Sequence, residues 1–291
     1  MILGTDWWTD CDDAVAVRIL ARAAKRGEIE LCGIGINAAM EHSVASLDGF
    51  LHKEGLLDIP LGIDLAATDF GGAPSYQARL AAYAVRYTKN TDACDAVSLY
   101  RKILAEADAP IEILEIGFPQ VLAALLESTG DEFSPKSGME LIRERVKHTW
   151  VMAGKWDKDG ERENNFCRNA RSRVAAEKLC RLWPVPITFL GWEIGYDVIS
   201  GSRLRSGDVL RDVLVDHGSP NGRSSWDPML VLLALSGDAA AAGYKKVIGR
   251  ATVDAETGAN HFTPDENGSH AYVVKALEND YYRDAIDRLI G

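Results

Sequence analysis

The sequence has few cysteines, and they share no evident task. The 291 residues contain five cysteines at widely separated positions and no C-x-x-C pair: Cys11, Cys32, Cys94, Cys167 and Cys180. This odd, scattered set argues against a disulfide framework and against a structural zinc site. We therefore expect a reducing, cytoplasmic environment.

Positive charge and long apolar runs are also scarce. The chain has 32 Lys and Arg against 43 Asp and Glu, a formal net charge of −11. A nucleic-acid or anionic membrane surface would have to be met by clustered Lys and Arg, so neither partner is expected. No run reaches the roughly 18 apolar residues that span a bilayer, and residues 1–8 do not resemble a signal peptide. Small molecules are the expected partners.

What the sequence does contain is an alternation of short apolar strands with amphipathic helices. Strands are expected at 1–5, 28–36, 58–64, 111–116, 149–153 and 187–190. Helices are expected at 13–25, 42–53, 76–87, 95–107, 119–127, 138–146 and 171–182, and later from 227 and at 280–290, with a hairpin around 247–274. This order predicts an α/β fold with a doubly wound, mostly parallel sheet and helices on both faces. No repeat or linker interrupts it, so residues 1–291 are expected to form a single domain.

Four aspartates lie within eight residues, just after the first expected strand: Asp6, Asp10, Asp12 and Asp13. The carboxyl edge of a parallel sheet is where ligands bind. Helix capping and complementing the helix dipole would explain one or two of these acids, but not four. Carboxylates this close repel one another unless a cation neutralises them, and a hard divalent ion with oxygen ligands is the usual solution. The cluster therefore predicts a metal site.

Other polar and aromatic residues follow later strands. Trp192 and Glu193 come after the strand 187–190, where they would offer a stacking surface and a hydroxyl acceptor, although an aromatic at a strand end is more often part of the core. Asn37 follows the strand 28–36 and is expected to face the ligand cleft. The G-x-G-x-x-A string at 33–38 lies on that strand and not on a strand-turn-helix connection, so a dinucleotide site is not expected.

The run Thr5–Ala14, TDWWTDCDDA, resembles the N-terminal aspartate signature of the nucleoside hydrolases, with Trp8 where the family's pattern has Gly. The resemblance implies an α/β fold with a bound Ca²⁺ ion that cleaves the N-glycosidic bond of ribonucleosides. It also implies that Asp6 and Asp13 coordinate the ion and that Asp12 accepts a proton from the attacking water. Asp10 competes for either role.

Three further segments match the same family in order along the chain. Glu163–Phe166 resembles a motif that binds sugar hydroxyls through Glu163 and Asn165, although a polar surface loop would look similar. The segment 116–122 aligns with one whose backbone carbonyl binds calcium, a place held here by Gln120. The segment 222–229 matches a motif whose aspartate completes the calcium shell, here Asp227, although Asp before Pro is also typical of a helix N-cap.

One position departs from the family in a way that affects the chemistry. Many members have a histidine just before this last aspartate, and it is implicated in protonating the departing base; Trp226 stands there in this chain. Stacking of the base on Trp226 or Trp192 is the resulting hypothesis. The sequence thus predicts calcium-dependent hydrolysis of ribonucleosides or related N-ribosides, by a homo-oligomer (dimer or tetramer) as the resemblance implies. The alternatives are an inactive metal- and sugar-binding protein of the same fold and, less favoured, a magnesium-dependent phosphatase using the D-x-D of residues 10–12.

Overall fold

The computed structural model describes residues 1–291 and contains one large mixed sheet with the strand order β4-β3-β2-β1-β5-β6-β8-β13-β11-β12-β7. Eight neighbouring strands pair in parallel: β4 (Cys94–Asp95), β3 (Leu61–Ile63), β2 (Gly33–Ile36), β1 (Ile2–Thr5), β5 (Ile111–Glu115), β6 (Val146–Met152), β8 (Ile187–Leu190) and β13 (His270–Lys275). The sheet continues antiparallel through β11 (Tyr244–Val253), β12 (Ala259–Pro264) and β7 (Glu161–Arg162). The predicted mostly parallel sheet and the C-terminal hairpin are confirmed.

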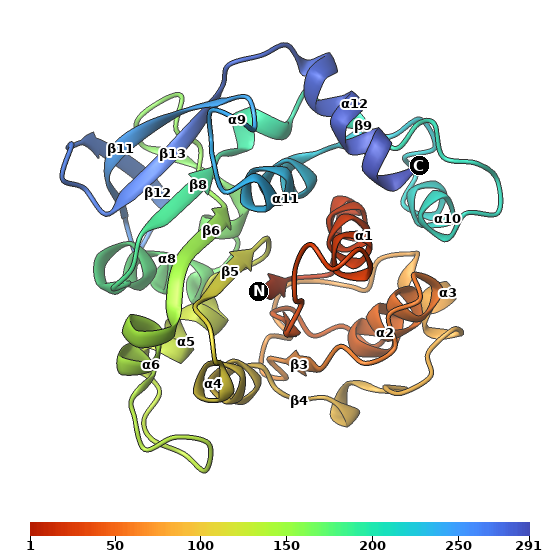
Figure 1. The fold of residues 1–291 in the computed structure, drawn as a ribbon, viewed down its shortest axis with the longest axis horizontal. Helices are drawn as coiled ribbons and strands as arrows, with labels where there is room; N and C mark the ends of the chain where they lie inside the picture. Colours follow the sequence, from red (N-terminus) through yellow and green to blue (C-terminus); the bar gives the residue numbers. More distant parts are fainter.

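Helices cover both faces of this sheet, as predicted (Figure 1). One face packs against α1 (Asp12–Lys25), α2 (Ser43–Lys53), α10 (Val209–Asp216), α11 (Trp226–Ser236) and α12 (Asn279–Ile290). The other packs against α4 (Ala96–Glu106), α5 (Gln120–Glu127), α6 (Gly138–Arg145) and α8 (Ala170–Leu182). Short elements complete the chain: α3 (Gln77–Ala81), the 3₁₀ turn at Asn90–Asp92, α7 (Asn164–Cys167), α9 (Trp192–Gly195), and the two-stranded pair β9 (Ile199–Ser200) and β10 (Arg223–Ser224). No helix is both long and apolar enough to span a membrane.

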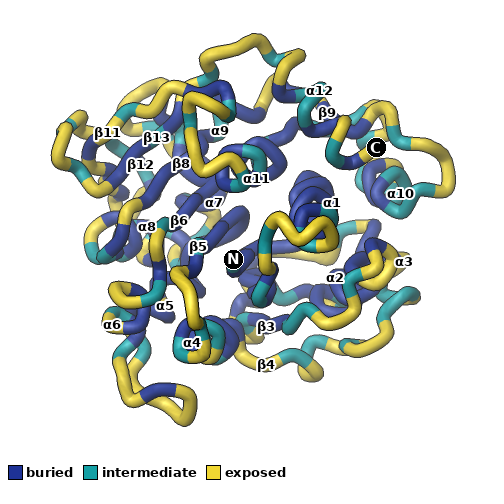
Figure 2. Tube along the Cα trace, viewed as in Figure 1, coloured by how far each residue is buried: buried dark blue, intermediate teal, exposed yellow.

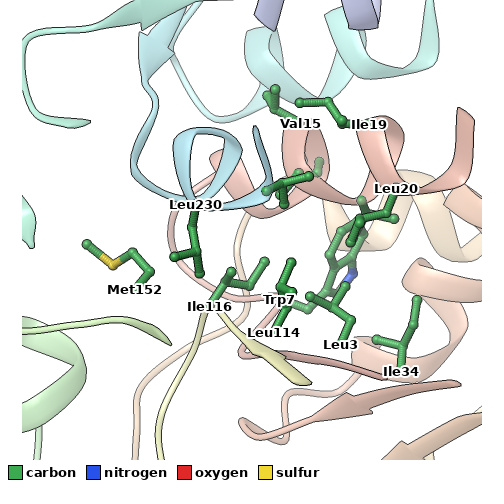
Figure 3. Packing of buried hydrophobic residues seen from close by; sticks show 14 of the residues in the cluster. Leu3, Trp7, Val15, Ile19, Leu20, Ile34, Leu114, Ile116, Met152 and Leu230 are labelled. Carbon is green, nitrogen blue, oxygen red and sulfur yellow. The ribbon is translucent and has the colours of Figure 1, made fainter. Parts of the chain in front are cut away.

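The central strands are apolar on both faces because each face is covered by helices. Successive side chains of a strand point to opposite faces, so Ile2 joins the core under α4 and α5 while Leu3 joins the core under α1 and α11. Likewise, Ile113 of β5 joins the core under α4 and α5, and Leu114 joins the core under α1 and α11. Figure 2 shows the central strands buried along their length, and Figure 3 shows part of the core on the α1 side.

Three segments differ from their sequence predictions. Residues 28–31 are not part of β2, which begins at Gly33 opposite Ile2, and Glu28 and Glu30 remain in solvent. The helix expected at 76–87 shortens to the five residues of α3. Helix α10 was not predicted, although its signal is present: Asp208 caps the helix, and Leu210, Val213 and Leu214 are buried at helical spacing.

The winding of the chain places a crevice beside β1. From β1 the chain proceeds outward through β2, β3 and β4, then returns to β5 on the other side of β1 and proceeds outward through β6 and β8. The strand order therefore reverses between β1 and β5. In open α/β sheets, ligands bind at the carboxyl ends of the strands at such a reversal.

Candidate active site

The connection between β1 and α1 brings three aspartates to this crevice. Asp6 directly follows β1, and Asp12 and Asp13 form the first turn of α1; all three are buried. The hydroxyl of Thr5 and the backbone N–H of Trp7 donate to Asp13, the latter at 3.3 Å. The residue before α1 is Cys11, and no side chain caps this helix. Capping therefore does not account for these acids.

Trp8 occupies the place of the family's glycine without adopting a glycine-like backbone. The positive φ angles fall on its neighbours, Trp7 at 47° and Thr9 at 56°. Such angles are unfavourable for β-branched and bulky side chains, so the surrounding contacts must hold the turn. Trp8 supplies part of that support, since its Nε1 donates to the Gly72 carbonyl at 2.7 Å and its backbone N–H donates to Asp6 Oδ1 at 3.2 Å.

The fourth acidic residue of the cluster comes from the start of α11. This helix begins at Trp226 after Ser225, so the predicted N-cap role of Asp227 is wrong; Asp227 lies in the first turn instead. Its backbone N–H donates to Asp12 Oδ2 at 3.1 Å. Carboxylate oxygens of Asp12, Asp13 and Asp227 all lie within 4.8 Å of one another, a spacing that fits a shared metal ion.

The charge on this cluster is not compensated by protein cations. No Lys, Arg or His forms an ion pair with Asp6, Asp12, Asp13 or Asp227. Burial raises the pKa of each of the four carboxyls well above its ordinary value, and neighbouring carboxylates raise it further. Buried, converging oxygen donors without a protein counter-charge fit a hard divalent cation.

The cluster forms one wall of a cavity of about 220 Å³. Nine predicted site residues line it: Asp6, Asp10, Asp12, Asp13, Glu163, Asn165, Trp192, Trp226 and Asp227. Five others were not predicted as site residues: Ile116, Met152, Trp8, Thr9 and Asn164. The signal for the first two was their position at the carboxyl ends of β5 and β6. A larger hollow of about 810 Å³ lies at the amino edge of the sheet around Met1 and Ile111, and we place the site in the smaller cavity because the carboxylates converge there.

Glu163 and Asn165 are held rigidly beside the cavity by backbone hydrogen bonds. The carboxylate of Glu163 accepts from the N–H groups of Gly154 at 2.9 Å and Asn165 at 2.8 Å. The amide of Asn165 donates to the Met152 carbonyl at 2.9 Å. Burial raises the pKa of Glu163 to about 7. The segment that carries Glu163 and Asn165 is therefore an ordered part of the cavity wall and not a solvated surface loop.

Two tryptophans form an aromatic wall of the cavity. The ring centres of Trp192 and Trp226 lie 6.3 Å apart with an interplanar angle of 30°, and the ring of Tyr196 stacks on Trp192 at 4.4 Å. Trp226 Nε1 donates to the Trp192 carbonyl at 2.7 Å, which fixes the ring. The Arg223 guanidinium lies 5.4 Å from the ring centre of Trp226.

Asp10 lines the same cavity, but its charge is already paired. Arg223 binds it in a bidentate manner, with Nη2–Oδ2 at 2.6 Å and Nε–Oδ1 at 2.8 Å. His217 Nε2 lies 3.8 Å from Asp10 Oδ1. This ion pair ties the β1–α1 turn to the segment that leads into α11, and so to Asp227.

Three predicted residues do not line the cavity. Both polar ends of the Asn37 side chain are used inside the protein, because Nδ2 donates to Glu115 and Oδ1 accepts from the N–H of Phe118. Gln120 begins α5 and lines a separate hollow between α4, α5 and α8, while its amide donates to the Asn37 carbonyl. Glu193 accepts from the Trp156 N–H at 3.3 Å. None of the three lines the cavity that holds the acidic cluster, and their roles as ligands stay predictions.

Comparison with known proteins gives a match in fold but not in sequence. No protein-family model matches the chain, and no curated protein matches its sequence. A purine-preferring ribonucleoside hydrolase from Gardnerella vaginalis superposes with a TM-score of 0.73 at 15% identity, covering 99% of this chain and 97% of that chain. An inosine-uridine preferring nucleoside hydrolase from Bacillus anthracis gives 0.69 at 14%, covering 99% and 98%. The fold is that of the nucleoside hydrolases.

A third solved structure with the nucleoside hydrolase fold is the type III effector protein XopQ complexed with adenosine diphosphate ribose. It superposes with a TM-score of 0.68 at 16% identity, covering 99% of this chain and 92% of that chain. At these identities the likeness concerns the fold. The residues that could act in this chain must therefore be argued from its own cavity.

A buried acid beneath the cavity was not anticipated from the sequence. Glu115 ends β5 opposite Gly4 of β1, and the side chain is fully buried. One of its oxygens accepts from Asn37 Nδ2 at 2.7 Å and from the Gly117 N–H at 3.0 Å, while Oε2 has no partner. Glu115 and Asn37 thereby hold the turn that follows β5 in the nucleoside hydrolase fold.

Replacing Glu115 by Gln is expected to change how stability depends on pH. Burial raises the pKa of Glu115 to about 8, above its value in the unfolded chain. Its contribution to stability is therefore complete at low pH and is lost as pH rises from about 4.5 to about 8, on the order of 5 kcal/mol in all. In urea titrations with chelator present, Glu115→Gln should be more stable than wild type at pH 8 and should lose that advantage by pH 5. A difference that does not vary with pH contradicts the expectation.

Proposed function

We propose that this protein is a divalent-metal-dependent N-ribohydrolase that cleaves ribonucleosides or related N-ribosides to free base and ribose, with Ca²⁺ as its ion. The observation that carries the proposal is the cluster of Asp12, Asp13 and Asp227 at the strand-order reversal of a nucleoside hydrolase fold. An acid–amide pair and two indole rings line the same small cavity as this cluster. A riboside has matching parts: a reacting carbon, hydroxyls and an aromatic base.

The proposed roles follow from where the groups lie. Asp6, Asp13 and Asp227 would hold the ion, which when bound lowers the pKa of a water molecule. Asp12 lies within the cluster and accepts the proton of the attacking water. Glu163 and Asn165 bind sugar hydroxyls, and their hold strengthens as the ribosyl ring becomes an oxocarbenium ion, as in glycosidases.

Between the two candidate bases, we propose Asp12 as the base and Asp10 as a positioning residue. Arg223 binds Asp10 through Nε and Nη2, which compensates its charge and occupies both of its oxygens. Asp12 instead has no ion-pair partner and accepts one hydrogen bond, from the backbone N–H of Asp227. A group in this position is free to accept a proton.

The proposal is tested with a panel of ribonucleosides and other N-ribosides, incubated with calcium or with chelator, following free base and reducing sugar by chromatography. Metal-dependent release of both products supports the proposal. Tight binding of metal and riboside without release supports the inactive binding protein instead, an alternative favoured to a small degree by the ADP-ribose complex of XopQ on the same fold. A phosphorylated aspartate formed from a phosphate ester supports the phosphatase.

Two finer points belong to the same proposal. Small-molecule ribosides are the partners, and the chain assembles as a homodimer or homotetramer, as the sequence resemblance implies. Light scattering on the purified protein tests the assembly, and a monomeric mass at micromolar concentration contradicts it.

A further inference from the structure

We infer that the preferred substrates are N-ribosides of cationic aromatic heterocycles, such as N-ribosylpyridinium compounds, in place of neutral purine or pyrimidine nucleosides. This inference rests on the proposed N-ribohydrolase function and names its substrate class. It comes from the groups that line the cavity together with the metal-binding carboxylates.

The aromatic wall offers ring faces to the base and no group suited to protonating it. Trp192 and Trp226 form this wall, and the Trp226 N–H is already donated to the Trp192 carbonyl. An indole N–H can donate a hydrogen bond but does not release a proton in this pH range. A base that departs over this wall meets two π faces.

The titratable side chains that line the cavity are all carboxyls, and each already has a role other than protonating the base. Asp12, Asp13 and Asp227 converge as the candidate metal site, and Asp6 lines the cavity beside them. Asp10 is paired with Arg223, which does not itself line the cavity. Glu163, the remaining one, accepts backbone hydrogen bonds through both oxygens. Burial raises the pKa of Glu163 to about 7, but both of its oxygens are held by these backbone donors. In the proposed function they bind sugar hydroxyls, so Glu163 acts at the sugar and not at the departing base.

The leaving-group chemistry then separates two classes of substrate. When a neutral nucleoside is cleaved, the electron pair of the C1′–N bond leaves the base as an anion, which needs a proton in the transition state. In an N-ribosylpyridinium the same pair neutralises the ring nitrogen, so the base departs neutral. Water supplies the oxygen of ribose, and one proton passes through Asp12 to solvent. The products are ribose, the neutral heterocycle and H⁺.

The charge of the site also suits a cationic ring. Six carboxyl side chains line the cavity, and no Lys, Arg or His lines it. Cations bind favourably over the faces of tryptophan rings. The ring of Tyr196 stacks on Trp192 and enlarges the aromatic surface. The same wall therefore attracts the cationic base and lets it leave unprotonated.

The test compares nicotinamide riboside, whose ring is cationic at all relevant pH values, with inosine and uridine. For each, kcat/KM is divided by the rate constant of spontaneous hydrolysis in the same buffer, because cationic ribosides are intrinsically more labile. We expect this enhancement to be at least tenfold larger for nicotinamide riboside than for either neutral nucleoside. Equal or larger enhancement for inosine or uridine overturns the inference and leaves the proposed function standing. No release from any of the three overturns both.

Two variants at position 226 connect the preference to the wall. Trp226→His places a proton donor beside the base, so the ratio of nicotinamide riboside to inosine enhancement should fall at least tenfold. Trp226→Phe keeps an aromatic face and should keep the preference for the cationic substrate. Because each ratio is measured on one protein preparation, a partly unfolded variant does not distort it. An unchanged ratio in Trp226→His overturns the assignment.

Discussion

The variant Asp13→Asn is expected to lose calcium binding and, with it, turnover. Asp13 is placed by Thr5 and Trp7 so that its carboxylate meets those of Asp12 and Asp227. An amide carries no charge and is a weaker ligand for a hard cation. With calcium at about one hundred times its dissociation constant, wild type should gain about 2.7 kcal/mol in the free energy of unfolding, and the variant should gain none. Calorimetry with calcium or with chelator measures both gains.

The design has an internal control in the metal-free state. Without metal, Asp13→Asn removes one member of a mutually repelling buried cluster, so the variant should unfold at the same temperature as wild type or higher. Asp58→Asn, at an exposed position outside the cavity, is the matched control and should keep the full calcium gain. If Asp13→Asn responds to calcium as wild type does, Asp13 is not a ligand.

Asp12→Asn is expected to reduce kcat by about 10²–10⁴-fold, the usual contribution of a general base. The isosteric amide retains an oxygen that can accept the Asp227 N–H, so the start of α11 should stay in place. The measurement is kcat on the best substrate at saturating calcium, with the calcium-induced rise in Tm recorded in parallel. A retained calcium response with lost turnover identifies Asp12 as the base.

Asp10→Asn serves as the comparison for that experiment. Its oxygens bind Arg223, and the ion pair is partly exposed, so the variant should lose less than tenfold in kcat. The opposite ranking, with Asp10→Asn the more damaged enzyme, would transfer the role of the base to Asp10. Either ranking decides between two residues that the sequence left open.

The strands and helices of the parallel part of the fold were predictable from the sequence, because the spacing of apolar residues in a strand or helix is a local property. β1, β5, β8, α1 and α4 lie within two residues of their predicted bounds. Prediction failed where strand pairing sets the ends of a strand. β2 begins only at Gly33, because that is where its partner β1 begins to pair, at Ile2. It failed also in the Gly- and Ser-rich stretch that contains α10, where the apolar spacing was present but went unrecognised.

In the candidate site, too, local sequence predicted some residues correctly, and tertiary contacts decided the others. Asp6, Asp12 and Asp13 were predictable because they are neighbours in sequence and one strand end places them together. Asn37, Gln120 and Glu193 also follow a strand or begin a helix, yet their side chains are turned to partners inside the protein. Position at a strand end shows which edge a residue occupies. It does not determine which hydrogen-bond partner its side chain finds there.

The sequence by itself determined that this is a mostly parallel α/β protein with a cluster of acids at the end of its first strand. Those properties depend on apolar periodicity and on residues close together in the chain. Only the tertiary structure decided that Asp227 joins Asp12 and Asp13, that Asp10 is paired with Arg223, and that Trp192 and Trp226 line the same cavity side by side. These contacts join segments more than 30 residues apart. Sheet order and helix packing bring such segments together, and neither is encoded in any local stretch of the sequence.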